Sequence, residues 1–286
     1  MEVCISRSEL SSYLASRRGN PRVLVPTMGA LHRGHTSLFD RAGEVAREMG
    51  GGDIVATIFV NPVQFGPNED FEAYPRPLED DLAKCREHGV NAVFVPEVAT
   101  IYAEDRSITI TENRLSSTLC GASRPGHFDG VCTVVAKLFN LTLPDAAIFG
   151  EKDYQQLAVI RRLVRDLDFP VRILAGSTIR ENDGLALSSR NVYLTPEQRA
   201  EAPILHRALV ATARGIADGR LTTPTEAGDE FLHLISAADL ARLDYFEIVD
   251  ASTLEPLRAF GGSEPRLIAA AFFGKTRLID NVGVQV

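Results

Sequence analysis

Strand-like and helix-like hydrophobic patterns alternate over the first two thirds of this chain. Short apolar runs predict strands, and apolar positions spaced three or four apart predict helices between them. Such alternation is typical of a parallel sheet that is covered on both faces. The predicted strands are residues 23–25, 53–60, 92–95, 107–111, 146–149 and 171–174, and the predicted helices are 8–18, 36–49, 78–88, 130–141 and 154–166.

The pattern changes near residue 180, where the polar segment 180–184 interrupts the alternation. Two long helical patterns and then three consecutive strands follow, which favours a separate α+β domain. We therefore expect a Rossmann-like, doubly wound parallel α/β domain over residues 1–179 and a smaller C-terminal α+β domain over residues 180–286. The helices expected in the second domain are 196–217 and 225–237, and the strands are 243–249, 266–273 and 277–279.

Composition narrows the class of protein. The 286 residues carry a formal net charge of −8, so the protein lacks the positive field of a general nucleic-acid binder. Four scattered cysteines without a Cys-x-x-Cys pair indicate buried free thiols in a reducing compartment. No apolar run approaches the roughly 18 residues of a membrane span, and residues 1–10 lack a signal-peptide core. We expect a cytoplasmic enzyme that acts on small molecules, without nucleic-acid or membrane partners.

The segment 26–35, Pro-Thr-Met-Gly-Ala-Leu-His-Arg-Gly-His, carries the strongest chemical signal. It joins the predicted strand 23–25 to the predicted helix 36–49 and places His32 and His35, with a glycine between them, at the helix start. Free N–H groups and the positive dipole end make a helix start attractive to phosphate. Two imidazoles there add donors for phosphate oxygens. The alternative is a pair of surface histidines in a loop.

Polar segments follow two further predicted strands. Asn61 and Gln64 follow strand 53–60, where open α/β sheets bind their ligands, and carboxamides can both donate to and accept from a small polar substrate. Lys152 and Gln156 follow strand 146–149, and a lysine at a helix start favours a bound anion that compensates it. The alternatives are an Asn-Pro turn with a solvated Gln64 and an ordinary surface lysine.

Three other polar segments carry weaker signals. Residues 188–190, Ser-Ser-Arg, lie just past the predicted domain boundary and could clamp phosphate, although many such triplets are plain loop. Arg124 and His127 precede a predicted helix, and packing or a subunit contact explains them as well as catalysis does. The acidic run 79–81 could suggest a metal site, but carboxylates are also favoured in the first turn of a helix. We predict no metal site built from protein side chains.

Five motifs run in order along the chain: Pro-Thr-Met-Gly-Ala-Leu-His-x-Gly-His, Ile-Phe-Val-Asn-Pro-Val-Gln-Phe, Gly-Ala-Ser-Arg-Pro-Gly-His-Phe, Phe-Gly-Glu-Lys-Asp-Tyr-Gln-Gln and Asp-Gly-Leu-Ala-Leu-Ser-Ser-Arg-Asn. In sequence and in order they resemble the motifs of the pantothenate synthetase family. The similarity extends through residues 278–281 and covers essentially the whole chain. One motif alone would indicate only the wider group of nucleotidyltransferase-like enzymes with a His-x-Gly-His motif. Val63 and Leu187 stand where many family members have Met. The motifs occupy residues 26–35, 58–65, 121–128, 149–156 and 183–191.

The resemblance implies ATP-dependent condensation of (R)-pantoate with β-alanine, which yields pantothenate, AMP and diphosphate. By analogy, pantoate attacks the α-phosphorus of ATP to give an enzyme-bound pantoyl adenylate, and the amine of β-alanine then attacks its carbonyl. Adenylation is required chemically because a carboxylate offers an amine only a poor leaving group. The resemblance also implies Mg²⁺, held mainly by phosphate oxygens and water, and a homodimer.

The resemblance further implies the roles of the site residues. His32 and His35 would contact the phosphates, with His35 as the proton donor. Lys152 would neutralise charge that grows on the phosphates, Asp153 would hold the ribose or the loop, and the serines and Arg190 would hold the departing diphosphate. The catalytic residues would be His32, His35, Lys152 and Arg190. The expected ATP-binding residues are Met28, Gly29, Ala30, Leu31, His32, Arg33, Gly34, His35, Gly150, Glu151, Lys152, Asp153, Ile179, Leu187, Ser188, Ser189 and Arg190.

Pantoate would be bound by Gln64 and Gln156, with Asn61 beside them. Two other classes of function remain open at this point. A nucleotidyltransferase with the same His-x-Gly-His motif would leave AMP on its product, and a nonenzymatic module would only bind nucleotide. An aminoacyl-tRNA synthetase is disfavoured by the acidic charge and by the lack of an added basic domain.

Overall fold

The computed structural model describes residues 1–67 and 69–284, which form two compact units. The first unit comprises Met1–Glu151 and Val159–Ser177. The second unit comprises Lys152–Ala158 and Thr178–Val286, so a short segment from the middle of the chain groups with the C-terminal part. The sequence predicted a single boundary between residues 179 and 180, and it did not predict that residues 152–158 group with the second unit.

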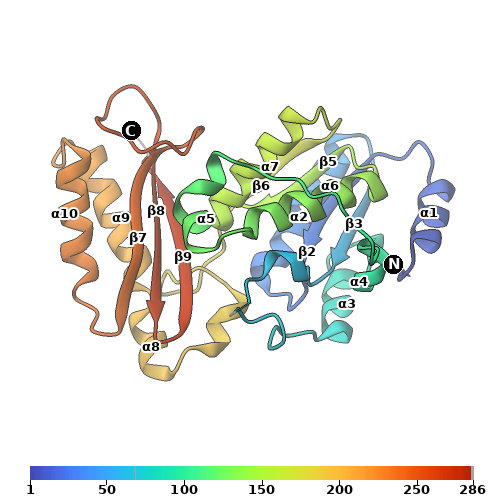
Figure 1. Cartoon of the computed structure of the whole chain (residues 1–286), viewed down its shortest axis with the longest axis horizontal. Helices are drawn as coiled ribbons and strands as arrows, with labels where there is room; N and C mark the ends of the chain where they lie inside the picture. Colours follow the sequence, from blue (N-terminus) through green and yellow to red (C-terminus); the bar gives the residue numbers. More distant parts are fainter. Residues whose placement is uncertain (68, 285–286) are drawn as a thin grey trace. The chain divides into compact units, whose positions relative to one another are not determined.

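A six-stranded parallel sheet forms the first unit, as the alternating pattern predicted (Figure 1). Its strand order is β1-β4-β3-β2-β5-β6, so the chain runs outward from β2 in one direction and outward from β5 in the other. The gap between the ends of β2 and β5 is therefore the topological switch point, where open α/β sheets bind ligands. The strands are β1 (Glu2–Cys4), β2 (Arg22–Thr27), β3 (Asp53–Ile58), β4 (Ala92–Phe94), β5 (Ala146–Gly150) and β6 (Arg172–Gly176).

Both faces of this sheet are buried. Val23 and Val25 point to the face that packs on α2 and α3, whereas Leu24 between them is equally buried on the opposite face. On α2 the buried residues Leu38, Ala42 and Val45 recur every three or four positions, which places them on one side of the helix. The helices are α1 (Arg7–Ser16), α2 (Arg33–Glu48), α3 (Leu78–Glu87), α4 (Val98–Ile101), α5 (Leu119–Ser123), α6 (His127–Thr142) and α7 (Tyr154–Asp166), with short 3-10 helices η1 (Pro62–Gln64), η2 (Leu115–Ser117) and η3 (Glu151–Asp153).

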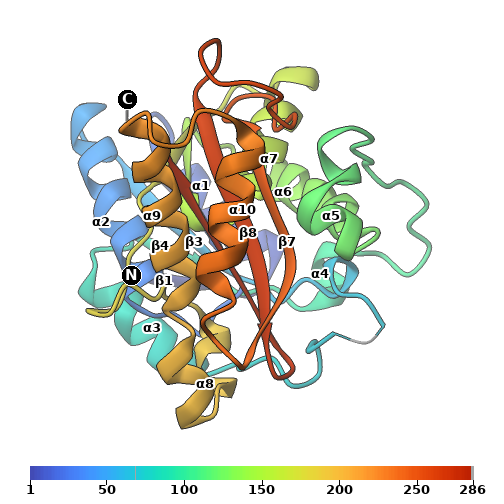
Figure 2. The ribbon, with the colours of Figure 1, turned by 90° about the vertical axis from the view of Figure 1, so that its left-hand side faces the viewer.

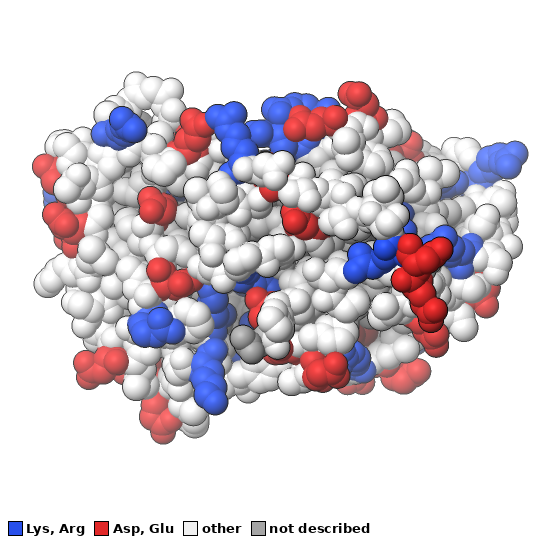
Figure 3. Space-filling view, in the orientation of Figure 1, with Lys and Arg blue, Asp and Glu red and all other residues white. Residues whose placement is uncertain are grey.

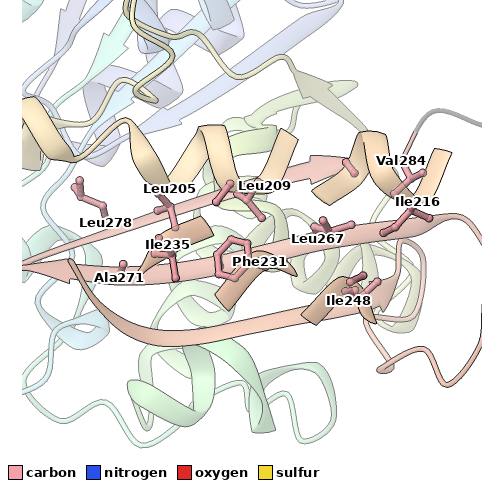
Figure 4. Packing of buried hydrophobic residues seen from close by; sticks show 14 of the residues in the cluster. Leu205, Leu209, Ile216, Phe231, Ile235, Ile248, Leu267, Ala271, Leu278 and Val284 are labelled. Atoms are coloured by element: carbon pink, nitrogen blue, oxygen red, sulfur yellow. The ribbon is translucent and has the colours of Figure 1, made fainter. Parts of the chain in front are cut away.

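An antiparallel sheet of β7, β8 and β9 forms the core of the second unit, which confirms the predicted α+β class. Helices α9 and α10 lie side by side over one face of this sheet (Figure 2). Their apolar side chains pack against those of the strands (Figure 4). Phe231 on α10 also stacks on Phe246 of β7, with ring centroids 3.9 Å apart. The elements are η4 (Ser189–Tyr193), α8 (Pro196–Glu201), α9 (Ile204–Ala217), α10 (Pro224–Ile235), β7 (Ala241–Asp250), β8 (Pro265–Phe273) and β9 (Thr276–Gly283).

The structure differs from the predicted elements at several places. The strand predicted at 107–111 is irregular, and its Ile108 is 79% exposed, so alternation there reflects no buried face. The helix predicted at 196–217 ends at Glu201 and restarts after Pro203, because proline offers no N–H to the preceding turn. Strand β1 and the short helices α4 and α5 were not predicted.

None of the described helices is both long enough and apolar enough to span a lipid bilayer. The four cysteines are buried and free, as their scattered positions predicted. On the face drawn in Figure 3, acidic and basic side chains lie beside one another, which gives this face a mixed charge.

Candidate active site

The loop that follows β2 is held in an unusual backbone conformation. Gly29 has φ +84° and Ala30 has φ +51°, so two consecutive residues occupy the left-handed region. A Cβ on Gly29 would lie 3.0 Å from Asp81 Oδ2, so the position has neither the conformational freedom nor the space for a side chain. The loop therefore needs a glycine here, and its path brings the next backbone amides against α3.

Asp81 on α3 fixes this loop. Its Oδ2 accepts a hydrogen bond from the amide of Ala30 at 2.8 Å, and its Oδ1 accepts one from the amide of Leu31 at 2.7 Å. Lys84, one helical turn later, donates to the carbonyl of Leu31 at 2.7 Å. The acidic run 79–81 does occupy the first turn of a helix, as predicted, but Asp81 is only 1% exposed and does more than complement a dipole. The sequence pattern alone gave no sign of these contacts with the loop.

His32 and His35 together cap the N-terminus of α2. The Nδ1 of His32 accepts from the amide of Gly34 at 3.1 Å, and the Nδ1 of His35 accepts from the amide of His32 at 3.3 Å. An amide can only donate, so neither Nδ1 carries a proton, and in the neutral rings the proton is on Nε2. The two ring centroids lie 4.1 Å apart. The helix start at the switch point therefore holds two adjacent Nε2–H donors.

Gln64 ends the short helix η1, which follows strand β3. Its Oε1 accepts from Asn61 Nδ2 at 3.0 Å, and its Nε2 donates to Met28 Sδ at 3.0 Å. Within the described part of the chain, these two contacts leave Gln64 one further amide hydrogen and one further oxygen lone pair. These contacts place Gln64 beside the loop that leads to His32.

Asn61 is buried, and its amide is used within the protein. Besides Gln64, its Nδ2 donates to the carbonyl of Gly130 at 3.1 Å, and its Oδ1 accepts from the hydroxyl of Tyr102 at 2.8 Å. Burial raises the pKa of Tyr102 to about 12, so this phenol remains a donor. This geometry makes Asn61 a support for Gln64.

Arg124 and His127 hold the backbone of the same segment. The Nδ1 of His127 donates to the carbonyl of Gln64 at 2.8 Å, and its Nε2 accepts from Arg124 Nη1 at 3.0 Å. Arg124 also forms two 2.6 Å hydrogen bonds with Glu69. Burial by itself would raise the pKa of Glu69, but the hydrogen bonds and charge of Arg124 outweigh it and leave that pKa below its ordinary value.

Gly130 allows α6 to approach this segment closely. A Cβ at this position would lie 2.5 Å from the carbonyl oxygen of Val63 and 2.7 Å from Gln64 Cα, both backbone atoms that cannot swing aside. The glycine therefore sets how near η1 lies to the start of α6. The 121–128 motif and its following glycine thus serve to place Gln64.

Lys152 lies in η3 immediately after β5, and the residues from Lys152 to Ala158 belong to the second unit. Its Nζ lies 3.7 Å from Asp153 Oδ1, and its backbone carbonyl accepts from Asn281 Nδ2 at 2.9 Å. Residues four apart, such as Lys152 and Gln156, are neighbours on one face of a continuous α-helix, but the chain here is not one continuous α-helix. Instead Lys152 lies in a 3-10 turn and Gln156 in the first turn of α7, so the four-residue spacing does not place them on one α-helical face.

Ser188 caps the short helix η4, and its hydroxyl accepts from the amide of Arg190 at 3.3 Å. The segment before it forms a tight hairpin, with a bridge between Arg180 and Ala186 and a 3.0 Å hydrogen bond from the amide of Leu187 to the carbonyl of Ile179. The serine and arginine side chains of 188–190 are thus presented from an ordered turn. Over residues 1–67 and 69–284, no three His, Cys, Asp or Glu side chains gather as a set of metal ligands.

Comparison with known proteins points in one direction. A family model described as pantoate-beta-alanine ligase matches residues 2–283. The chain is 48% identical over 285 residues to the pantothenate synthetase of Akkermansia muciniphila, covering 99% of each protein. It is 54% identical over 266 residues to the pantothenate synthetase of Paramagnetospirillum magneticum, covering 92% of this chain and 89% of that protein.

Solved structures agree. The crystal structure of pantothenate synthetase from Thermus thermophilus superposes with a TM-score of 0.93 at 46% identity and covers both chains completely. The pantoate-beta-alanine ligase from Francisella tularensis, complexed with beta-gamma ATP and beta-alanine, has a TM-score of 0.81 at 31% identity. It covers 100% of this chain and 98% of that chain.

Proposed function

This chain belongs to the pantoate-β-alanine ligase family, and we propose that it forms pantothenate through a pantoyl adenylate held at the switch point of its parallel sheet. It is a ligase of pantothenate biosynthesis, as the resemblance implied. ATP and β-alanine are taken as substrates by analogy with the ligand-bound relative. The observation that carries the site assignment is the pair of Nε2–H donors on His32 and His35 at the start of α2.

In the first step a carboxylate oxygen of pantoate attacks the α-phosphorus of ATP, the bond to the bridging oxygen breaks, and diphosphate leaves. Positive and hydrogen-bonding groups at the helix start stabilise the charge that develops on the phosphates, and such preorganised contacts are worth about 2.7–4 kcal/mol each. We assign this role to His32 and His35, with His35 as the proton donor, and to Lys152. Ser188, Ser189 and Arg190 hold the departing diphosphate.

In the second step the amine of β-alanine attacks the acyl carbon, a proton leaves the nitrogen, and AMP departs with the bonding electrons. Gln64 and Gln156 bind the hydroxyl and carboxylate oxygens of pantoate, and Asn61 holds Gln64 in place. Met28 and the residues up to His35 enclose the nucleotide, and Asp153 lies near its ribose. Gly150, Glu151, Ile179 and Leu187 complete the ATP site, while residues 180–286 act as a lid that excludes water from the adenylate.

Mg²⁺ enters in this proposal as part of the nucleotide substrate. The ion would be held mainly by phosphate oxygens and water, as the resemblance implied. Bound there, it would supply charge neutralisation at the phosphates. We also propose a cytoplasmic homodimer, and sedimentation at several protein concentrations tests the assembly.

The reaction is tested with purified protein, ATP, Mg²⁺, pantoate and β-alanine. We expect AMP release to require both organic substrates and expect the organic product to carry no phosphate by mass spectrometry. A product that retains AMP would instead establish the nucleotidyltransferase alternative. AMP release without β-alanine would overturn the ligase assignment. Rapid quenching without β-alanine should trap a species with the mass of pantoyl adenylate.

A further inference from the structure

Asp280 and Asn281 are consecutive residues of β9, so their side chains point to opposite faces of the small sheet. Asp280 is 3% exposed and accepts two hydrogen bonds from Arg180, at 2.6 Å and 2.9 Å. His206 on α9 lies 3.4 Å from the same carboxylate. Burial alone would raise the pKa of Asp280, but His206 and Arg180 outweigh it and lower that pKa, so the carboxylate is ionised.

The pair of Asp280 and Arg180 fixes the hairpin that leads to η4. Arg180 also donates to the carbonyl of Gly184 at 3.1 Å, which closes the hairpin on itself. Asn191, within η4, donates to the carbonyl of Ala186 in the same hairpin at 3.1 Å. Strand β9 contacts η4 directly as well. The position of residues 188–190 therefore depends on Asp280.

Asn281 fixes the segment that contains Lys152. Its Nδ2 donates to the carbonyl of Lys152 at 2.9 Å, and its Oδ1 accepts from Arg266 Nε at 2.9 Å. The guanidinium of Arg266 lies 3.9 Å from the centroid of the Tyr154 ring, and the Tyr154 hydroxyl donates to the carbonyl of Ala251 at 2.8 Å. These contacts explain why residues 152–158 group with the second unit.

We propose that Asp280 and Asn281 are positioning residues that set Lys152 and the 188–190 turn in register with each other, each from one face of β9. The inference rests on the proposed function, in which both of these cationic elements bind the phosphates of ATP. A cation bound to a transferring phosphate must be placed closely, because a shift of about 1 Å can cost about a hundredfold in rate. Two anchors on consecutive residues of one strand leave little freedom between the elements that they hold.

The principal test substitutes Asn281→Asp. This variant keeps an acceptor for Arg266 but replaces the donor to the Lys152 carbonyl with an oxygen, so it separates the two contacts of Asn281. We expect kcat for diphosphate release to fall between about tenfold and a hundredfold, with KM for pantoate and β-alanine changed by less than about twofold. Asp280→Asn should give the same separation of kcat from KM. If Asn281→Asp does not fold, Asn281→Ser removes both hydrogen bonds without adding a charge.

A matched control is available in the same sheet. Asp244 on β7 pairs with Arg277 on β9 at 2.8 Å, and both side chains are about as buried as Arg180. Asp244→Asn should lower the melting temperature while leaving kcat unchanged. If Asp280→Asn and Asn281→Asp behave like this control, their role is structural and the inference is wrong.

A double-mutant cycle separates this inference from the proposed function. In a Lys152→Ala background we expect Asn281→Asp to cause no further loss of kcat, because the group that it positions is gone. Full activity of Lys152→Ala would refute the phosphate-binding role of Lys152. Impaired Lys152→Ala, together with an additive loss from Asn281→Asp, would refute only the positioning role.

Discussion

The loop between β2 and α2 should depend on one buried carboxylate. Asp81 accepts two backbone hydrogen bonds, from Ala30 and Leu31, and these hold the left-handed turn that precedes His32. Asp81→Asn retains the shape of the side chain but can accept only one of these bonds through its oxygen. The second amide of the loop would then face an NH₂ group. One charge-assisted hydrogen bond is lost, and a buried donor remains unsatisfied.

The magnitude follows from those two losses. Hydrogen bonds to a charged group contribute about 1.5–3 kcal/mol, and an unsatisfied buried donor costs a further 1–3 kcal/mol or so. We therefore expect the free energy of unfolding to fall by about 3 kcal/mol or more. For a unit of this size that corresponds to a melting temperature roughly 6–12 °C lower. Because the loop places His32, kcat should fall as well.

Asp80→Asn provides the matched control, since Asp80 is the preceding residue of the same helix turn and is exposed. It removes the same charge, and we expect its effect on stability to stay within about 0.5 kcal/mol. Urea unfolding and steady-state release of AMP measure both variants. Equal losses of stability in the two variants would show that helix-dipole electrostatics, and not the hydrogen bonds to the loop, account for Asp81.

Three further predictions use other parts of the molecule. His35→Asn keeps an oxygen that can accept from the amide of His32 but removes Nε2, so kcat should fall about a hundredfold or more while the melting temperature is nearly unchanged. His35→Ala removes the acceptor as well, so both kcat and the melting temperature should fall. Because Arg124 lowers the pKa of Glu69 below its ordinary value of 4.5, their ion pair stabilises the fold above that pH and is lost as the pH falls through the lowered pKa. The difference in unfolding free energy between wild type and Glu69→Gln, measured by urea titration from pH 7 to pH 3, should therefore close in acid, and a constant difference would contradict this. Burial raises the pKa of the Cys4 thiol to about 11 and the pKa of the Cys85 and Cys132 thiols to about 12. A thiol reagent at pH 8 should therefore label none of these three cysteines until the protein unfolds.

The sequence predicted the elements whose burial leaves a regular pattern. The strands around Val23 and Ile54 and the apolar face of α2 follow such patterns, and their order implied the parallel sheet. The motif order indicated the family, which the family model and relatives confirm. The prediction at 107–111 failed because Ile108 alternates with polar residues without any partner strand. The helix break at Pro203 could have been predicted from the proline itself, because proline inside a helical pattern ends or kinks the helix.

The missed contributions come from contacts between residues that are distant in the chain. Asp81 looked like a helix-dipole carboxylate, because only the folded loop brings the amides of Ala30 and Leu31 to it. Asn281 lies in the segment 278–281, to which the family resemblance extends, but its partner Lys152 lies 129 positions away. Spacing along the chain carries no information about such pairs. Such residues hold the backbone of the candidate site, while the motifs supply the groups that we propose to face substrate.

The grouping of residues 152–158 with the second unit has a consequence for how this chain is made. The polypeptide passes from one unit to the other after Glu151, after Ala158 and after Ser177. During synthesis Lys152 therefore leaves the ribosome long before β9 is made. The segment 152–158 cannot form its contact with Asn281 until this last strand has been synthesised. A fragment that ends at Ser177 would carry the lysine without its anchor. A chimera of two relatives joined at a single cut after Ser177 would take the lysine from one parent and its anchor from the other, because Lys152 and Asn281 lie on opposite sides of that cut.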